Sequence, residues 1–233
     1  MLSNGDPDQE PLAREGLGPR GNGVGVPKIV DQELRRQQLV EAAWRVINRL
    51  GLERTTIREI ALESGFSTGA LAHYFPTKDD ILRSALERAD QEVKARLDRI
   101  PDDAPALTKL RHALRQALPL DVERSFELTL DVNFWARALN QPALRALQHR
   151  DHDVWRRRII ELVEQAQAAE QLDDAQAADV VADITVAFVD GLGLQGLVYP
   201  ELVTRERIDE LVDAHLTAWG ADPVHLTDLE VYS

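Results

Sequence analysis

The sequence predicts an all-α protein in two parts: an N-terminal three-helix head with a helix-turn-helix, linked by a long helix to an α-helical body. Good helix formers, mainly alanine, leucine, glutamate and arginine, dominate the chain. Apolar residues recur at the spacing of a helix face, and no alternating strand pattern competes with them. Residues 55–78 combine a helix, a glycine turn and a second short helix, which is typical of a helix-turn-helix.

The first predicted helix covers residues 32–50, and Gly51 ends it. Its apolar residues fall on one face that we expect to be buried. They are Leu39, Ala43, Val46, Ile47 and Leu50.

The second predicted helix, residues 56–63, forms the first half of the helix-turn-helix. Ile57, Ile60 and Ala61 line one face, and the hydroxyl of Thr55 or Thr56 can cap its start. Gly65 follows where the chain must turn, because glycine tolerates a positive φ. We therefore expect the chain to turn there toward a third helix.

The third predicted helix, residues 68–74, can be capped by Ser67 or Thr68. Leu71 and Phe75 are four residues apart and should point inward. Small side chains on the opposite face would let this helix lie deep in a DNA major groove, where hydroxyls bond base edges and methyls touch thymine. The outward residues are Thr68, Gly69, Ala70, Ala72 and His73.

The remaining chain is predicted to form helices at residues 78–99, 106–118, 122–140, 143–169, 175–198 and 204–219. We divide it into a disordered tail (1–28), a helix-turn-helix domain (29–78), an effector-binding and dimerisation domain (79–220) and a loose polar tail (221–233). Glycine and proline without apolar periodicity mark the first tail.

Composition narrows the class of protein. The 233 residues include no cysteine, so disulfides and thiolate chemistry are excluded, which fits a reducing cytoplasm. No stretch approaches the roughly 20 apolar residues of a membrane-spanning helix, and we find no apolar signal core. We therefore predict a cytoplasmic protein.

The net charge of −13 is distributed unevenly along the chain. Residues 28–78 carry eight basic and six acidic side chains, a net charge of +2, whereas residues 79–233 carry −13. Residues 1–27 carry −2. An acidic body would repel a phosphate backbone, so only the head is expected to face DNA.

The head resembles that of TetR-type transcriptional repressors over roughly residues 29–86. Three sequence segments are most similar to the BetI group of choline-responsive regulators: PKIVDQELRRQQLVEAAWRVINRLG, STGALAHYFPTKDDIL and NFWARA. The start of that group matches residues 26–28, so residues 1–25 are interpreted as an extension. The resemblance implies a homodimer whose heads bind an operator.

This resemblance also implies DNA contacts for individual residues. Thr56 would bond a phosphate, Lys78 would anchor one, and Ser67, Thr68 and Gly69 would lead the third helix into the groove. His73 and Tyr74 match positions that grip backbone or base edges, although core packing is an equal alternative for Tyr74. Many relatives carry a tyrosine where this chain has Ala72. Base recognition at this position would therefore depend on a methyl contact, or on Thr68 and Ala70 instead. Arg58 could reach DNA, or be a solvated surface arginine.

Aromatic and polar residues of the body form a candidate effector site. Core packing is the alternative for each aromatic, but a regulator needs a mostly apolar pocket with a few orienting polar groups. Aromatic rings with a carboxylate such as Asp131 could also cage a quaternary ammonium through cation-π attraction. The candidate residues are Phe126, Thr129, Asn133, Phe134, Trp135, His152 and Trp155.

The His149, Asp151, His152 and Asp153 cluster has a spacing that could chelate a metal, but a solvated polar face explains it as well. We find no glycine-rich phosphate loop and no catalytic motif. We therefore predict no enzyme activity, no cofactor and no bound metal. A metal-dependent helical protein that uses the His149 to Asp153 cluster stays an alternative.

Apolar residues of the last two predicted helices are candidates for a four-helix dimer interface, with burial inside one chain as the alternative. Gly191, Gly193 and Gly196 would weaken an isolated helix by about 1 kcal/mol each, so we expect them to permit close helix approach or a bend. The interface candidates are Val189, Leu192, Gly193, Gly196, Leu197, Leu211, His215 and Trp219.

These observations predict a homodimeric DNA-binding regulator, a repressor that a small-molecule effector releases from a pseudo-palindromic operator in double-stranded DNA. A transcriptional activator of the same family is one alternative. An acidic helical carrier whose head does not engage DNA is another.

Overall fold

The computed structural model describes residues 28–226, and within them every regular element is helical. Of the predicted tail of residues 1–28, residues 1–27 lie outside this range, and Lys28 is the first residue of α1. The elements are α1 (Lys28–Leu50), α2 (Ile57–Ser64), α3 (Thr68–Tyr74), α4 (Lys78–Leu97), α5 (Ala106–Gln116), α6 (Val122–Ala138), α7 (Pro142–Ala168), α8 (Ala178–Val198), α9 (Arg205–Ala218) and the short 3-10 helix η1 (Pro223–His225). The all-α prediction is confirmed, and most expected boundaries lie within a few residues of these.

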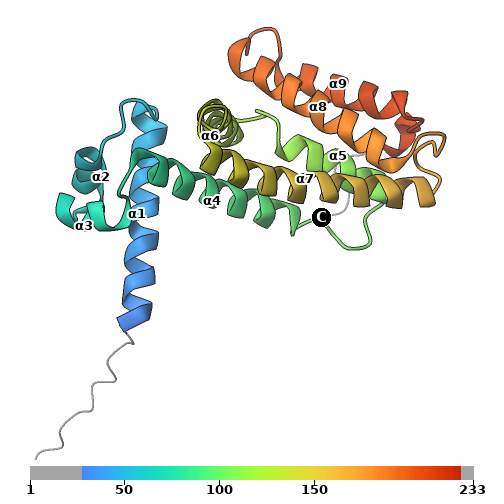
Figure 1. Cartoon of the computed structure of the whole chain (residues 1–233). Helices are drawn as coiled ribbons and strands as arrows, with labels where there is room; N and C mark the ends of the chain where they lie inside the picture. Colours follow the sequence, from blue (N-terminus) through green and yellow to red (C-terminus); the bar gives the residue numbers. More distant parts are fainter. Residues whose placement is uncertain (1–27, 227–233) are drawn as a thin grey trace, which may run out of the picture.

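The molecule has two parts connected by α4 (Figure 1). Helices α1 to α3 and the start of α4 make up the head, and α5 to α9 with the rest of α4 make up the body, where α8 and α9 lie side by side. α4 begins in a capping box, in which the Thr77 side chain accepts from the Asp80 backbone N–H while the Asp80 carboxylate accepts from the Thr77 backbone N–H.

The head is built around one group of buried apolar residues, which we call the head cluster. It contains the expected inward residues Leu39, Ala43, Val46 and Ile47, whereas Leu50 is only partly buried. It also contains Leu130 and Phe134 of α6. Because α6 belongs to the body, the two parts share buried surface and are not joined by α4 alone.

The body is built around a second group, the body cluster, to which α5, α7, α8 and α9 contribute. Gly193 and Gly196 allow α8 to approach its neighbours, because a Cβ would lie 2.9 Å from Leu128 Cδ2 and 2.7 Å from Pro119 Cγ, respectively. Nothing lies within 4 Å of a Cβ at Gly191. Close helix approach is therefore confirmed for two of the three glycines.

Two expectations need correction. By length and composition α8 is apolar enough to cross a membrane, and its inward residues are buried in the body cluster. The chain after Gly220 is not simply a loose tail, since Ala221 is buried and Pro223–His225 forms a turn of 3-10 helix. Residues 227–233 lie outside the described range.

Candidate functional site

The first half of the helix-turn-helix is fixed by side-chain hydrogen bonds at its start. Thr56 is the N-cap of α2, and its hydroxyl accepts from the Glu59 backbone N–H at 3.2 Å. Thr55 is buried, and its hydroxyl donates to the Gly51 carbonyl at 2.9 Å. Of the two threonines considered from the sequence, Thr56 is therefore the cap and faces solvent.

The turn and the third helix follow the predicted geometry. Gly65 has a φ of 74°, which places it in the left-handed region that favours glycine. Ser67 caps α3 by accepting from the Ala70 backbone N–H at 3.2 Å. Leu71 and Phe75 are 0% and 1% exposed, so they anchor α3 to the head cluster.

The opposite face of the helix-turn-helix is open. Thr56, Arg58, Ser67, Thr68, Gly69, Ala72 and His73 are exposed, and Ala70, Tyr74 and Lys78 are partly exposed. Tyr74 packs against the head cluster, as the core-packing alternative requires. The candidate DNA-contacting residues thus lie along one connected segment, from the cap of α2 to the start of α4.

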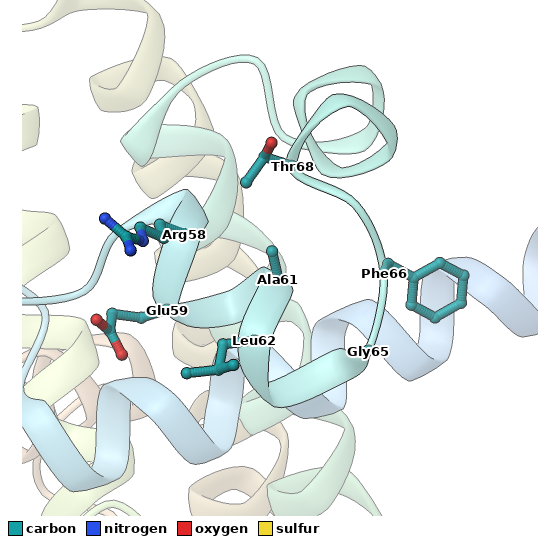
Figure 2. A pocket seen from close by; sticks show the side chains of 7 residues that line it. All are labelled: Arg58, Glu59, Ala61, Leu62, Gly65, Phe66 and Thr68. Atoms are coloured by element: carbon teal, nitrogen blue, oxygen red, sulfur yellow. The ribbon is translucent and has the colours of Figure 1, made fainter.

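An open hollow of about 550 Å³ lies between α2 and the start of α3. Figure 2 shows Arg58, Glu59 and Leu62 projecting from α2 on one side, with Thr68 at the start of α3. Arg58 therefore stands beside the first residue of the candidate recognition helix.

Most cations of the head are paired with carboxylates. The Glu63 carboxylate accepts hydrogen bonds from Arg45 at 2.8 Å and from Arg49 at 3.0 Å. These hydrogen bonds lower the pKa of Glu63, and the bond from Arg45 has the largest effect. Arg54 and Arg58 have no ion pair within residues 28–226. Arg58 is consequently a strong candidate for a DNA contact.

Lys78, the expected phosphate anchor, already has partners inside the head. Its Nζ donates to the backbone carbonyl of Glu53 at 2.8 Å and lies 3.8 Å from the Glu53 carboxylate. A phosphate would have to compete with that carboxylate.

The aromatic residues predicted to form one effector site are only partly brought together, since Phe134 and Trp155 line adjoining hollows and Phe126 lies elsewhere. Phe126 packs edge-on against Trp44 of α1, with ring centroids 4.6 Å apart, and Arg88 lies over the same Trp44 ring. Phe134 is buried in the head cluster. These two rings join α6 to the head, because α6 has one face in each part of the molecule.

The polar members of that set also have other roles. The Thr129 hydroxyl donates to the Ser125 carbonyl and the Asn133 amide donates to the Thr129 carbonyl, both at 2.7 Å along α6. His152 is exposed. Trp135 has a buried indole N–H without an acceptor in the described residues.

A groove between α4 and α7 combines apolar walls with carboxylates. It consists of two adjoining hollows of about 490 and 350 Å³, which share Asp90, Val154 and Asp151. Its apolar walls include Trp155 and Phe134 from the predicted set. The other apolar lining residues are Leu86, Val93, Leu97 and Leu147.

The groove carboxylates are in an unfavourable environment for negative charge. Asp90 is open to the groove, but the surrounding walls withdraw it from bulk water, and this desolvation together with Asp151 and Glu87 raises its pKa to about 6. Desolvation likewise raises the pKa of Asp151, against the opposing charge of Arg150. Neither carboxylate forms an ion pair within the described residues, although the basic side chains of Arg83, Lys94, Arg150 and Arg158 also line the groove.

Asp131 of α6, the carboxylate predicted to attract a cation, lies deeper. Desolvation is the main cause that raises its pKa to about 8, and the charges of Asp90, Glu127, Asp190 and Asp151 add to it.

Sequence reasoning missed Asp90. This acid interrupts one helical stripe of α4 that is otherwise apolar and consists of Leu86, Val93 and Leu97.

Four residues of the predicted dimer interface are buried within the chain itself. Val189, Leu192, Gly193 and Gly196 pack against the body cluster, Leu128 and Pro119, so they present little exposed surface to a second copy. Leu197, Leu211, His215 and Trp219 are partly buried. His215 stacks on Phe188 and accepts a hydrogen bond from the Trp219 indole.

The His149 to Asp153 cluster is not assembled as a metal site. His149, His152 and Asp153 are exposed, Asp151 lines the α4–α7 groove, and no group of three or more metal-ligating side chains occurs within residues 28–226.

Comparison with known families matches both parts of the chain. Residues 39–85 match the model of bacterial regulatory proteins of the tetR family, and residues 106–220 match the model of the C-terminal part of BetI-type transcriptional repressors.

Similar proteins give the same result over most of the length. The regulator PksA of Bacillus subtilis is 32% identical over 195 residues, 82% of this chain and 92% of that protein. BetI of Burkholderia thailandensis is 31% identical over 179 residues, with 73% and 86% covered. A solved regulator from Saccharomonospora viridis in complex with choline is 27% identical, with a TM-score of 0.69 over 80% of this chain and 97% of that one.

Proposed function

Because this chain belongs to the TetR family of DNA-binding transcriptional regulators and has a BetI-type C-terminal region, we propose that it is a repressor released from its operator by a small organic cation. One observation supports the DNA-binding face. The start of α3, from Ser67 to Gly69, is capped and faces solvent, and the buried side chains of Leu71 and Phe75 anchor the helix to the head.

The proposed DNA face comprises the exposed residues of α2 and α3 together with Lys78. Thr68, Gly69 and Ala72 are small enough for close approach to base edges. Arg58 and Arg54, which lack carboxylate partners within the described residues, would supply the attraction to phosphate. The acidic body would favour docking through the head alone.

We propose a homodimer that assembles through the outward face of α8 with the neighbouring α9. Val180, Ile184, Leu194 and Val198 are 43%, 47%, 44% and 55% exposed and recur along one face of α8. We propose this exposed face as the dimer interface in place of the buried residues that the sequence predicted. Two-fold pairing would present two heads to a pseudo-palindromic operator.

A cytoplasmic location would follow from the soluble nature of the relatives of this chain.

We place the effector in the α4–α7 groove. Asp90 and Asp151 would attract a positive charge, and Trp155 offers an aromatic face for cation-π contact. The apolar walls would hold alkyl substituents. The choline complex of the Saccharomonospora viridis relative supports this class of ligand.

The effector would act by favouring one spacing of the two heads. The groove lies on α4, whose first residue is Lys78, so a ligand that separates α4 from α7 would displace the head. A conformational bias of about 3 kcal/mol would lower operator affinity by roughly 150-fold. Activation instead of repression would require only a different operator position.

Selection of bound duplexes from a random library tests DNA binding. We expect wild-type protein to enrich a pseudo-palindrome, Thr68→Ala to relax its sequence preference, and Arg58→Ala to weaken binding. Thr217→Ala, at an exposed position on α9, is the matched control. Failure of the wild-type protein to enrich any sequence at low salt would refute the proposal and favour a helical carrier.

Calorimetric titration tests the groove. Choline and tetraethylammonium should bind, whereas the uncharged analogue of choline, with a tert-butyl group in place of trimethylammonium, should not. Asp90→Asn and Asp151→Asn should each weaken cation binding, and Asp153→Asn, on the same helix but outside the groove, should not. Equal binding of the charged and uncharged compounds would remove the cation from the proposal.

A further inference from the structure

An arginine of the body reaches the part of the head that holds Lys78. Arg137, in the last turn of α6, bonds Asp79 at the start of α4 through Nη1. Its Nη2 lies 3.5 Å from Oε1 of Glu53, in the loop between α1 and α2. One guanidinium group therefore contacts two acidic residues that flank the proposed phosphate site.

Glu53 is shared between Arg137 and Lys78. Its other carboxylate oxygen, Oε2, lies 3.8 Å from the Lys78 ammonium, and its backbone carbonyl accepts a hydrogen bond from that group. Glu53 is 79% exposed, whereas Lys78 and Arg137 are 33% and 24% exposed. The carboxylate is thus free to move, while the two cations are held by their surroundings.

The charge balance of this group depends on Arg137. Lys78 and Arg137 carry two positive charges, and Glu53 and Asp79 carry two negative ones. Asp80 is occupied separately by the capping box and by Arg83. Removal of Arg137 would leave the group, Lys78 included, with a net charge of −1 at the place where a DNA phosphate is proposed to bind.

We infer that Arg137 is a positioning residue for DNA binding: it holds the carboxylates of Glu53 and Asp79, so that the Lys78 ammonium stays available to a DNA phosphate. Without Arg137, Glu53 pairs fully with Lys78 and competes with the phosphate. The inference rests on the Lys78 contact of the proposed function.

This arrangement also connects the body to DNA by a route other than α4. α6 is fastened to the head at Phe126 and Phe134, and Arg137 lies one turn beyond Phe134. A shift of α6 relative to α4 withdraws Arg137 from Glu53 and Asp79 together.

Fluorescence anisotropy of full-length protein tests the inference on two labelled duplexes, the sequence selected by the wild-type protein and a scrambled version. We expect Arg137→Ala to weaken binding to both duplexes by about three- to fivefold in low salt, the range typical of exposed ion pairs. The slope of log affinity against log salt should fall by about one unit, as for one lost phosphate contact. Arg137→Lys, which keeps the charge, should retain most of the affinity.

The double variant Glu53→Gln with Arg137→Ala decides the mechanism. We expect it to regain most of the lost affinity and salt dependence, because the competing carboxylate is gone. A double variant as weak as Arg137→Ala, or Arg137→Ala binding like wild type while Lys78→Ala is impaired, would overturn the inference. A loss confined to the selected duplex would also overturn it, since that indicates a displaced recognition helix.

Separate outcomes report on the proposed function. If the wild-type protein binds neither duplex, the DNA-binding face is wrong. If it binds but Lys78→Ala does not weaken binding, the phosphate contact and the inference both fail, while the other proposed DNA contacts stand. Circular dichroism melting of each variant identifies any loss of affinity that comes from unfolding.

Discussion

The head and the body of this regulator are stabilised in different ways. In the head, α2, α3 and α4 each begin with a hydroxyl cap, and ion pairs such as Arg36–Glu87 are exposed, at 42% and 48%. In the body, α5, α7 and α8 lack side-chain caps, whereas Asp121 caps α6 and Thr204 caps α9. Ion pairs of the body such as Arg96–Glu127 are withdrawn from water, at 15% and 5%. The difference indicates a head whose shape is set locally and a body whose stability depends on desolvated charge.

The largest expected effect tests the buried ion pair. Arg96 bonds both carboxylate oxygens of Glu127, and Arg96→Met would leave Glu127 buried without its hydrogen-bonded counter-charge. We expect a loss of about 3–5 kcal/mol in the free energy of unfolding, measured by urea denaturation. Arg36→Met in the head is the control, with an expected loss below about 1 kcal/mol. Similar losses for the two variants would remove the distinction between head and body.

Asp131 is expected to make the body sensitive to pH. Its pKa is raised in the folded protein, from its ordinary 3.8 to about 8, so the folded state binds more protons than the unfolded state between these values. Its stabilising contribution is therefore fully present below about pH 4 and is lost as the pH rises through 8. Asp90 acts in the same direction up to about pH 6.

Melting curves from pH 4 to 8 test this expectation. The wild-type protein should lose stability across the range relative to Asp131→Asn, and the variant should be the more stable of the two at pH 8. An Asp131→Asn protein with the wild-type pH profile would show that this carboxyl is solvated in the folded state.

Close packing of α8 should be visible in a pair of glycine variants. At Gly196 a Cβ meets the Pro119 ring at 2.7 Å, so Gly196→Ala should cost about 1–3 kcal/mol of stability. At Gly191, on the outward face of α8, no atom of the same chain lies within 4 Å, and Gly191→Ala should stabilise the helix of the single chain by up to about 1 kcal/mol. Chemical denaturation distinguishes the two signs, and equal effects would contradict the packing described for α8.

The smallest effect is expected in the head. Thr77→Ala removes the hydroxyl half of the capping box at the start of α4 and should cost about 1 kcal/mol. The same substitution at Thr217, which caps no helix, should have little effect. A loss as large as that of Arg96→Met would mean that the head is not locally stabilised.

Much of the DNA-binding part could be predicted from the sequence because its signals are local. A positive φ at Gly65, a cap at Thr56 or Ser67 and the inward pair Leu71 and Phe75 each depend on residues within a few positions of one another. Their specific DNA contacts stay predictions.

The candidate effector site and dimer face depended on the tertiary structure. Phe126 and Phe134 are aromatic residues on a body helix, yet packing places one against Trp44 and the other in the head cluster. Val189 and Leu192 face inward, whereas Ile184 and Leu194 face outward, and both faces of α8 are apolar.

The sequence by itself determined the helical class, the helix-turn-helix with its caps and turn, and the separation of charge between head and body. Only the tertiary structure decided which face of α6 and of α8 is buried, and which carboxylates share the α4–α7 groove. The physical reason is that caps and turns are satisfied within one or two helical turns. Burial and pKa instead depend on helices that are distant in sequence.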